Sequence, residues 1–308
     1  MPDITITIPT FRRPKGLERL LLAIDALETE ANVRVLVADN DAEKREGVAV
    51  VERLRSASGR WPIEVFVVEQ RGIAQARNAL VARALSGPFD WLAMLDDDEW
   101  PESSWLTAFL RVATETGADA LHGAVVPEFE KPPGRWAARC YGFAPLRNPT
   151  GPIAMIHGTG NAFLSRQVLA KLARPWFDPG FALTGGEDKD FFTRLKIAGA
   201  HLAWADEAVV HTEMPSSRAN ARWAVKRAFR VGNSDMRVFL KHTHALPAKV
   251  FEGVKIGGAL VLSLPFVLLA APLAEWRVLP VCKFARAAGK LSAALGLRYD
   301  EYAVTHGR

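Results

Sequence analysis

Residues 91–101, WLAMLDDDEWP, constrain the fold more than any other stretch, because an apolar run ends there in four consecutive acids. A short apolar run bounded by polar residues predicts a buried strand, and parallel α/β sheets bind ligands beyond the carboxyl ends of their strands. We therefore expect Asp96, Asp97 and Asp98 to lie at a ligand site.

The three aspartates are expected to divide between two sides of the chain. In an extended segment successive side chains alternate, so Asp96 and Asp98 would share one side and Asp97 would face the other. Two carboxylates on one side can hold a hard cation, Mg²⁺ or Mn²⁺, and leave positions open for nucleotide phosphates. The alternative is an acidic turn before a helix that begins near Ser103. Mutual repulsion of the carboxylates favours the cation site.

Alternating strands and helices predict a parallel sheet built from βαβ units. We expect strands at residues 4–8, 33–38, 63–68 and 91–95, and helices at residues 17–27, 48–54 and 73–85. Polar residues follow each strand, so they should meet at one edge of the sheet. The chain contains neither GxGxxG nor GxxxxGK[ST], which disfavours a dinucleotide fold and a P-loop kinase. A nucleotide would then be held by side chains and metal.

The length suits one large domain or a domain plus an appendage, since 308 residues can bury a sizeable core. Cys140 and Cys282 have no metal-ligand spacing and favour a reducing compartment without a disulfide framework. The opening residues, MPDITITIP, enter a strand without the pattern of a signal peptide. We expect the catalytic part to be cytoplasmic.

Positive charge gathers in the last third of the chain. Residues 216–308 hold 15 Lys/Arg against 5 Asp/Glu, whereas the rest holds 24 against 29. Residues 256–274 carry no charge, which points to an anionic membrane surface as partner and away from nucleic acid. The borderline length, with Pro265 and Pro272, favours a re-entrant or in-plane hairpin at the cytoplasmic face of the inner membrane. A buried helical pair in a soluble domain is the alternative.

Five motifs occur in order: PTFRR at 9–13, VADND at 37–41, RGIAQARN at 71–78, LDDDEWP at 95–101 and GGEDKDF at 185–191. Together they resemble family 2 of the inverting glycosyltransferases over about residues 4–235, particularly bacterial enzymes of succinoglycan-type exopolysaccharide synthesis. The resemblance implies the α/β GT-A fold, with a mainly parallel central sheet flanked by helices. It also implies a nucleotide-diphosphate sugar donor, with UDP favoured, and a divalent metal.

The expected organisation is a catalytic domain over residues 1–235 and a helical membrane-association region over residues 236–308. Within the first, residues 1–101 would bind the nucleotide and residues 102–235 the acceptor. Residues 127–152 are rich in proline and loop-like, and we interpret them as a flap over the acceptor or as a variable surface loop.

The resemblance assigns donor-binding roles residue by residue. It implies that Pro9 and Thr10 contact the nucleoside, that Asp39 bonds the base, and that Arg71 and Arg77 lie near the base or diphosphate. Asp39 could instead form an Asx turn, and Arg77 with its neighbour Asn78 could face solvent. The further predicted donor-binding residues are Arg12, Asp96, Asp97, Gly160, Asn161, Arg218 and Arg222.

Three of these assignments rest on local chemistry as well. Gly160 belongs to a glycine-containing segment, residues 157–161, that could approach the donor sugar or form a plain turn. Arg218 and Arg222 lie on a predicted helix within residues 216–235, where arginine forks suit diphosphate oxygens or lipid headgroups. Arg222-Trp223 is similar to the QxxRW motif of processive synthases, but Ala219 replaces its glutamine, which favours single additions.

The metal ligands implied by the family pattern are Asp96 and Asp98, with Asp96 also facing the ribose. Losing Asp98 should cost more activity than losing Asp97. His211 follows a predicted strand at residues 208–210 and is either a third ligand or a hydrogen-bonded structural residue.

An inverting transfer is a single displacement, so it needs a base for the proton of the acceptor hydroxyl. Residues 184–188 open a predicted helix whose amino end projects Glu187 and Asp188 toward the cleft. In the family that the chain resembles, Asp188 matches the base. Either acid could instead only cap the helix.

We therefore expect a metal-dependent inverting glycosyltransferase that moves one sugar to a lipid-linked saccharide acceptor. One alternative is a sugar-phosphate nucleotidyltransferase, although residues 9–16 lack its glycine-rich loop. The other is a non-catalytic nucleotide-sugar sensor at the membrane.

Overall fold

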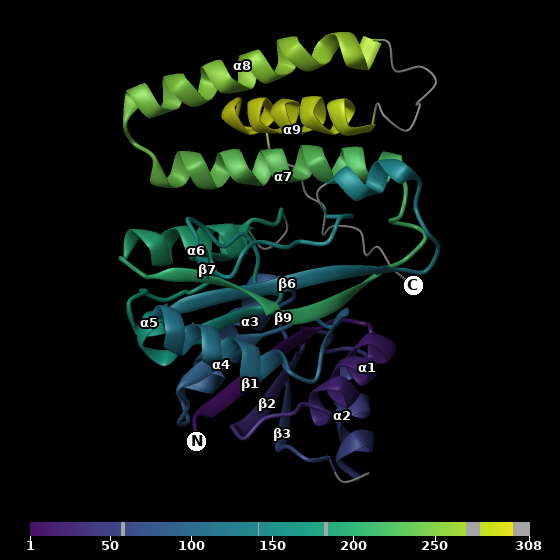
Figure 1. The fold of residues 1–308 in the computed structure, drawn as a ribbon, viewed down its shortest axis with the longest axis vertical. Coiled ribbons are helices and arrows are strands. Elements are labelled where there is room, and N and C mark those ends of the chain that lie inside the picture. The colour runs from purple at the N-terminus through teal and green to yellow at the C-terminus, as the bar shows by residue number, and fades with distance from the viewer. Residues whose placement is uncertain (57–58, 141, 182–183, 269–277, 298–308) are drawn as a thin grey trace. The chain divides into compact units, whose positions relative to one another are not determined.

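The computed structural model describes residues 1–56, 59–140, 142–181, 184–268 and 278–297. The chain divides into two compact units, of residues 1–126, 146–182 and 187–213, and of residues 127–145, 183–186 and 214–308. The first unit is α/β and the second is mainly helical (Figure 1). The predicted division at residue 235 stays a prediction.

The parallel half of the first unit follows the predicted βαβ pattern. Its strands β1 (Asp3–Thr10), β2 (Asn32–Asp39), β3 (Ile63–Val67) and β4 (Trp91–Met94) lie in the order β3-β2-β1-β4 and are all parallel. The helices α1 (Pro14–Asp25), α2 (Glu46–Ser56) and α3 (Ile73–Leu85) connect them. Thr10 pairs with Asp39, and Asp39 with Val67, so the strand ends meet at one edge as predicted.

The other half of the sheet includes antiparallel strand pairs. It contains β5 (Glu99–Pro101), β6 (Ala120–Phe129), β7 (Gly151–Pro152), β8 (Ala162–Ser165) and β9 (Leu202–Met214), and the sheet continues from β4 in the order β8-β6-β9-β5. Its helices are α4 (Trp105–Thr116), α5 (Arg166–Ala170), the 3₁₀ turn η2 (Pro179–Phe181) and α6 (Glu187–Ile197). The sheet is therefore mixed. The strand expected at residues 208–210 is part of the longer β9.

Helices cover both faces of this sheet, so that a hydrophobic core lies on each face. Alternate residues of a strand pack into these two cores. On β2, Val35 and Val37 pack with α1, α2 and α4, whereas Leu36 and Ala38 pack with α3, α5 and α6. This alternation is the geometry of a strand buried on both sides. The carboxyl edge of the sheet is left as the place where polar groups collect.

The second unit consists of α7 (Ala221–His242), α8 (Leu246–Leu268), α9 (Val278–Ala294) and the 3₁₀ turn η1 (Arg135–Arg139). Within it α9 lies between α7 and α8 (Figure 1). Contact between α7 and α9 is close, since a Cβ on Gly289 would overlap the carbonyl oxygen of Phe229. Cys140 and Cys282 are free, with their Sγ atoms 3.8 Å apart.

The predicted flap is packed around Phe143 and exposed over much of the rest of its length. Residues 127–129 continue β6, and Phe143 is buried with its ring centroid 4.8 Å from Trp136 and 5.5 Å from Trp223. The alternative of a variable surface loop is therefore wrong for the part around Phe143. Tyr141 lies outside the described residues, and the role over the acceptor stays a prediction.

Candidate active site

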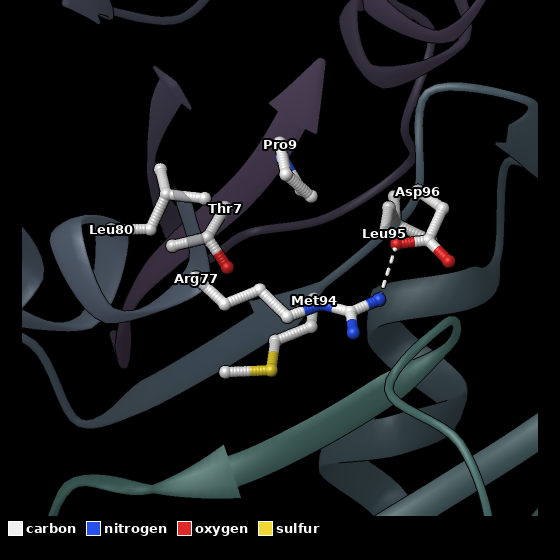
Figure 2. A pocket seen from close by; sticks show the side chains of 7 residues that line it. All are labelled: Thr7, Pro9, Arg77, Leu80, Met94, Leu95 and Asp96. Carbon is white, nitrogen blue, oxygen red and sulfur yellow. Dashed lines mark hydrogen bonds and ion pairs between the residues drawn. The ribbon is translucent and has the colours of Figure 1, made fainter. Parts of the chain in front are cut away.

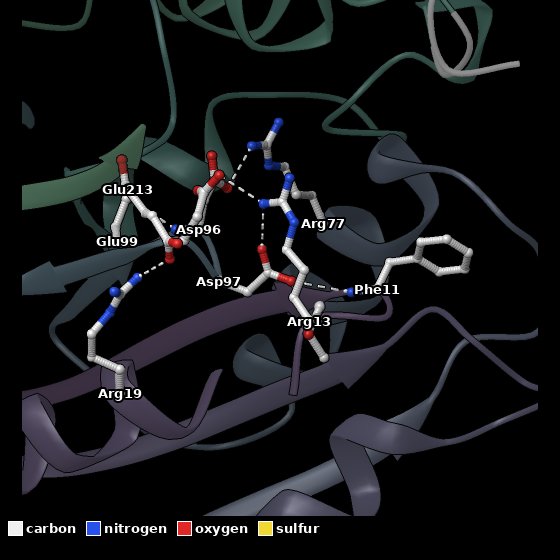
Figure 3. Close-up of polar contacts among 10 residues, drawn as sticks. Phe11, Arg13, Arg19, Arg77, Asp96, Asp97, Glu99 and Glu213 are labelled. Carbon is white, nitrogen blue, oxygen red and sulfur yellow. Dashed lines mark hydrogen bonds and ion pairs between the residues drawn. The ribbon is translucent and has the colours of Figure 1, made fainter. Parts of the chain in front are cut away.

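The four acids after β4 form a tight turn. The backbone N–H of Glu99 donates to the carbonyl oxygen of Asp96 at 3.0 Å, and the chain then enters β5. The expected alternation of an extended segment is wrong here, because the chain reverses direction. Asp97 and Asp98 both reach Arg13, whereas Asp96 reaches Arg77 (Figure 3).

Asp97 ties this acid turn, residues 96–99, to the loop after β1. Its Oδ2 accepts hydrogen bonds from Thr10 Oγ1 at 2.9 Å and from the Phe11 N–H at 3.2 Å, and its Oδ1 accepts one from Arg13 at 3.0 Å (Figure 3). Burial raises the pKa of Asp97 to about 6, against the opposing effect of Arg13. Its oxygens are thus committed to holding the loop, and its predicted donor contact stays a prediction.

Glu99 closes the other side of the turn. It is buried, and its Oε2 accepts a hydrogen bond from the Asp96 N–H at 2.9 Å. Burial, with Asp96 beside it, raises the pKa of Glu99 well above its ordinary value. A Cβ on Gly160 would overlap this carboxylate, so the predicted donor residue Gly160 lets the loop before β8 approach the acid turn.

Arg77 joins the acid turn to the start of α6. It is buried on α3, and its Nη2 donates to Asp96 Oδ1 at 2.9 Å while its Nη1 donates to Glu187 Oε1 at 2.7 Å. The alternative that Arg77 faces solvent is wrong, because its guanidinium pairs with two carboxylates. Asn78 does not face solvent freely either, since its amide pairs with the backbone of Phe177 at 2.7 and 2.9 Å.

A small cavity opens beside this arginine at the carboxyl edge of the sheet. Figure 2 shows its lining: Thr7, Pro9, Arg77, Leu80, Met94, Leu95 and Asp96. The predicted nucleoside contact Pro9 and the predicted ribose contact Asp96 therefore border one space.

Glu187 and Asp188 begin α6, where the helix dipole favours negative charge. Glu187 is buried, and its Oε2 has no hydrogen-bond partner among the residues that the structure describes. Burial, together with the charge of Asp188, raises the pKa of Glu187 to about 7. Asp188 is only half-buried, and its Oδ2 would lie 3.8 Å from a Cβ on Gly158. Asp188 is thus the more accessible of the two acids.

The raised pKa of Glu187 should make stability depend on pH. As pH rises from about 4.5 to about 7, we expect the free energy of unfolding of the unchanged protein to fall relative to that of the Glu187→Gln variant. The folded protein holds the Glu187 proton in this window, whereas the unfolded chain has released it. At about 1.4 kcal/mol per pKa unit, the difference between the two proteins should change by about 3 kcal/mol across the window. Urea denaturation of both proteins at several pH values measures it, and parallel profiles would contradict the buried, proton-holding Glu187.

The predicted base contact Asp39 is completely buried at the end of β2. Its Oδ1 accepts from the Asp41 N–H at 3.0 Å and its Oδ2 from the Val48 N–H at 3.1 Å. This is the Asx turn that the sequence left as the alternative, combined with a hydrogen bond to the first turn of α2. The neighbouring Asn40, which sequence reasoning missed, accepts from the Gly72 N–H at 2.7 Å and so fixes the start of α3.

Two predicted donor-binding arginines lie over one aromatic ring. The guanidinium carbons of Arg12 and Arg71 are 5.0 and 4.8 Å from the ring centroid of Phe11. Arg12 also pairs with Asp41 at 2.7 Å. Sequence reasoning missed Phe11 and Asp41, although the PTFRR and VADND motifs contain them.

Asn161 is a structural residue of the sheet. It is fully buried at a φ of 62°, its Oδ1 accepts from the Trp105 indole N–H at 2.7 Å, and its Nδ2 donates to the carbonyls of Ala124 and Ala208, each at 2.8 Å. The predicted contact between the Asn161 side chain and the donor is therefore corrected, because these bonds occupy the amide.

His211 lies within β9, opposite Trp100 on β5. Its Nε2 is 3.2 Å from a carboxylate oxygen of Glu102, and its ring stacks on Trp100. Its role as a metal ligand stays a prediction. Arg218 and Arg222 belong to the second unit, where Arg222 is exposed on α7, and their roles also stay predictions.

The acid turn fits a cation that is shared with a ligand. Among the described residues no three His, Cys, Asp or Glu side chains are grouped to hold a metal alone. Asp96 and Asp98 nevertheless offer hard oxygen donors on a partly open edge. One or two carboxylates completed by substrate phosphates are the usual protein environment of Mg²⁺. The residues present therefore fit Mg²⁺ or Mn²⁺ bound together with a diphosphate.

Comparison with known families gives two overlapping matches. The model of glycosyl transferase family 2 matches residues 5–172, and that of glycosyl transferase family group 2 matches residues 91–295. The succinoglycan biosynthesis protein ExoM of Rhizobium meliloti (strain 1021) is 36% identical over 248 residues, which cover 79% of this chain and 77% of that protein.

Two solved structures share the fold. The mannosyltransferase PcManGT from Pyrobaculum calidifontis, in complex with GDP-Man and Mn²⁺, has 18% identity and a TM-score of 0.59, covering 94% of this chain and 89% of its own. S. aureus TarS 1–349 in complex with UDP has 13% identity and a TM-score of 0.54, covering 96% and 92%. At these identities the likeness concerns the fold alone, and the predicted GT-A fold is confirmed.

Proposed function

The chain belongs to glycosyl transferase family 2, and on that basis we propose that it transfers one sugar from a UDP-sugar to a lipid-linked saccharide acceptor, with inversion, in exopolysaccharide synthesis. One observation carries the proposal. The buried guanidinium of Arg77 holds Asp96 of the acid turn and Glu187 at the start of α6, so that groups suited to a diphosphate and a base for a hydroxyl lie at one edge.

The chemistry is a single displacement. The acceptor hydroxyl oxygen attacks the anomeric carbon, its proton passes to Asp188, and the bond from that carbon to the diphosphate oxygen breaks. We assign the base to Asp188 because it is half-buried and can meet an incoming hydroxyl. Glu187 is buried against Arg77 and positions the first turn of α6.

Asp96 and Asp98 are the residues that would hold the divalent cation. When bound, it would neutralise the charge that develops on the departing diphosphate. The loop of residues 9–13 lies beside these acids through Asp97 and supplies positive charge from Arg13. Pro9 and Thr10 are then proposed to border the nucleoside.

A release assay tests this function. The purified protein is incubated with Mn²⁺, membrane-derived lipid-linked acceptor and UDP-, GDP- or dTDP-sugars, with EDTA and Asp188→Asn as controls. We expect nucleotide release that depends on the acceptor and is lost in both controls. The anomeric configuration of the product, determined by NMR, tests inversion.

Other outcomes would favour the two alternatives. Pyrophosphate release from a nucleoside triphosphate and a sugar phosphate would indicate nucleotidyl transfer. Metal-dependent binding of a nucleotide-sugar without turnover on any acceptor would indicate a sensor.

We also propose that the second unit binds the inner membrane surface through α8. This helix is long and apolar enough to cross a membrane by length and composition, and only 17% of its most apolar window is buried. Its buried positions Glu252, Ile256 and Ser263 form a narrow stripe, and Glu252 pairs with Lys290 of α9 at 2.6 Å. This ion pair holds α8 beside α9, which favours an in-plane position. Residues 269–274 of the predicted lipid-contacting segment lie outside the described residues.

The exposed apolar side chains of α8 should carry much of the binding to lipid. Val261 and Leu262 are 70% and 76% exposed, and burial of each aliphatic side chain is worth about 1.5–3 kcal/mol. We therefore expect the double variant Val261→Glu/Leu262→Glu to bind phosphatidylcholine–phosphatidylglycerol vesicles more than about tenfold more weakly, as measured by co-sedimentation. Ile197→Glu, at 67% exposure on α6, is the matched control and should change nothing. Equal losses in the two variants would contradict a role specific to α8.

A further inference from the structure

Arg13 occupies one carboxylate oxygen of Asp98, the residue proposed to hold the cation. It immediately precedes α1, and its Nη1 lies 2.7 Å from Asp98 Oδ2 and 3.0 Å from Asp97 Oδ1 (Figure 3). One guanidinium nitrogen therefore bridges the two carboxylates. A divalent cation on Asp98 would meet this positive charge directly, and like charges at such separations repel strongly.

The two partners of Arg13 differ in how exposed their carboxylates are. Asp97 is fixed by Thr10 and by the Phe11 N–H, and a Cβ on Gly16 would overlap its carbonyl oxygen, so α1 packs tightly on this part of the turn. The carboxylate of Asp98 is more exposed than that of Asp97, at 24% against 9%. Arg13 can therefore leave Asp98 while it stays paired with Asp97.

A diphosphate can replace the hydrogen bond to Asp98 that Arg13 loses when it moves away from that carboxylate. Guanidinium groups bind phosphate oxygens through charge-assisted hydrogen bonds of the same kind as those to a carboxylate. The side chain of Arg13 is 32% exposed, so an anion arriving at this edge can reach it. Without an anion, a cation at Asp98 would cost Arg13 one of its two carboxylate partners and would not replace it.

We propose that Arg13 is a counter-ion for the acid turn that moves from Asp98 to the donor diphosphate, so that cation and donor bind as a pair. This inference rests on the proposed function, because it takes the ligand to be a nucleoside diphosphate with a divalent cation. Arg13 is then a donor-binding residue, and it weakens cation binding to the donor-free protein.

Binding measurements with Mn²⁺ and UDP test the proposal without turnover. Free Mn²⁺ is followed by electron paramagnetic resonance, with and without UDP, and UDP binding is measured by calorimetry with and without Mn²⁺. In the unchanged protein we expect UDP to strengthen Mn²⁺ binding. In Arg13→Ala we expect Mn²⁺ alone to bind about tenfold more tightly, the scale on which one neighbouring charge alters an ionisation equilibrium. UDP should bind this variant more weakly and should strengthen Mn²⁺ binding less than in the unchanged protein, although its phosphate oxygens still complete the coordination of the cation.

Arg19→Ala is the matched control. Arg19 lies on the same helix, is 37% exposed and pairs with Glu213 at 2.7 Å, so its loss removes one positive charge without touching Asp97 or Asp98 (Figure 3). Mn²⁺ affinity should stay within about twofold of the unchanged protein, since exposed charges at a distance are screened by salt. Arg13→Met keeps the apolar stem without the charge, and it replaces Arg13→Ala if that variant does not fold.

The outcomes separate this proposal from the proposed function. Normal coupling of UDP and Mn²⁺ in Arg13→Ala and Arg13→Met would overturn the role of Arg13 and leave the glycosyltransferase reaction standing. Failure of the unchanged protein to bind UDP, GDP or dTDP with Mn²⁺ would overturn both.

Discussion

Asp188→Asn is expected to lower the rate of sugar transfer by about 10³-fold, within the range that general bases contribute to catalysis. An amide cannot accept the proton of the acceptor hydroxyl, whereas its shape and its place in the first turn of α6 are unchanged. The melting temperature and the affinity for the nucleotide-sugar should therefore stay close to those of the unchanged protein. Single-turnover transfer measures the loss at saturating donor, where a binding defect would not contribute.

Glu187→Gln is the matched comparison, because it makes the same chemical change at the adjacent residue. Glu187 is buried with one oxygen on Arg77, so its loss should disturb the position of α6 and reduce turnover by about tenfold, as losses of orienting partners do. Asp188→Asn should also remove the acid limb of the pH–rate profile, and Glu187→Gln should retain it. The reverse order of effects would assign the base to Glu187.

The first half of the fold could be predicted because its signals are local. Each strand of the parallel half is a run of apolar residues closed by polar ones, and α3 was predicted at its observed bounds. The second half of the sheet, from β5 to β9, was harder to predict from the sequence. Asp206 and Glu207 interrupt the apolar pattern of β9, yet the strand continues through them, because Asp206 pairs with Arg147 and Glu207 with Thr150. Such compensation depends on partners distant in sequence.

In the candidate site, too, features with local signals could be predicted, whereas contacts between residues distant in sequence could not. The sequence predicted that the acids of residues 96–98 and those at the start of α6 would lie at one edge, since strand ends and a helix start carry them. It did not predict that Arg77 would join them, or that Arg13 would bridge Asp97 and Asp98. Those contacts depend on the turn that reverses the chain after Asp96, and the spacing of residues does not specify the turn. Asn161 was misjudged for a related reason, because motif position does not reveal burial.

Asp98→Asn is expected to reduce Mn²⁺-dependent transfer by about 10²-fold or more, the scale for removal of one preorganised electrostatic group. It should leave the free energy of unfolding nearly unchanged, because Arg13 still pairs with Asp97. Asp97→Asn should behave in the opposite way. It should lower the free energy of unfolding by about 2 kcal/mol, the worth of a hydrogen bond to a charged group.

The two variants should differ because the neighbouring carboxylates of Asp97 and Asp98 have different roles in the acid turn. Asp97 is 9% exposed, and Asn at this position would turn an N–H₂ group toward donors that need an acceptor: Thr10, Phe11 or Arg13. Asp98 is 24% exposed and partly open to an incoming cation. Urea denaturation together with transfer rates at graded Mn²⁺ concentrations separates the two effects. If Asp98→Asn unfolded as easily as Asp97→Asn and its lost activity did not depend on Mn²⁺, both acids would be structural, and the cation would have to bind elsewhere on the edge.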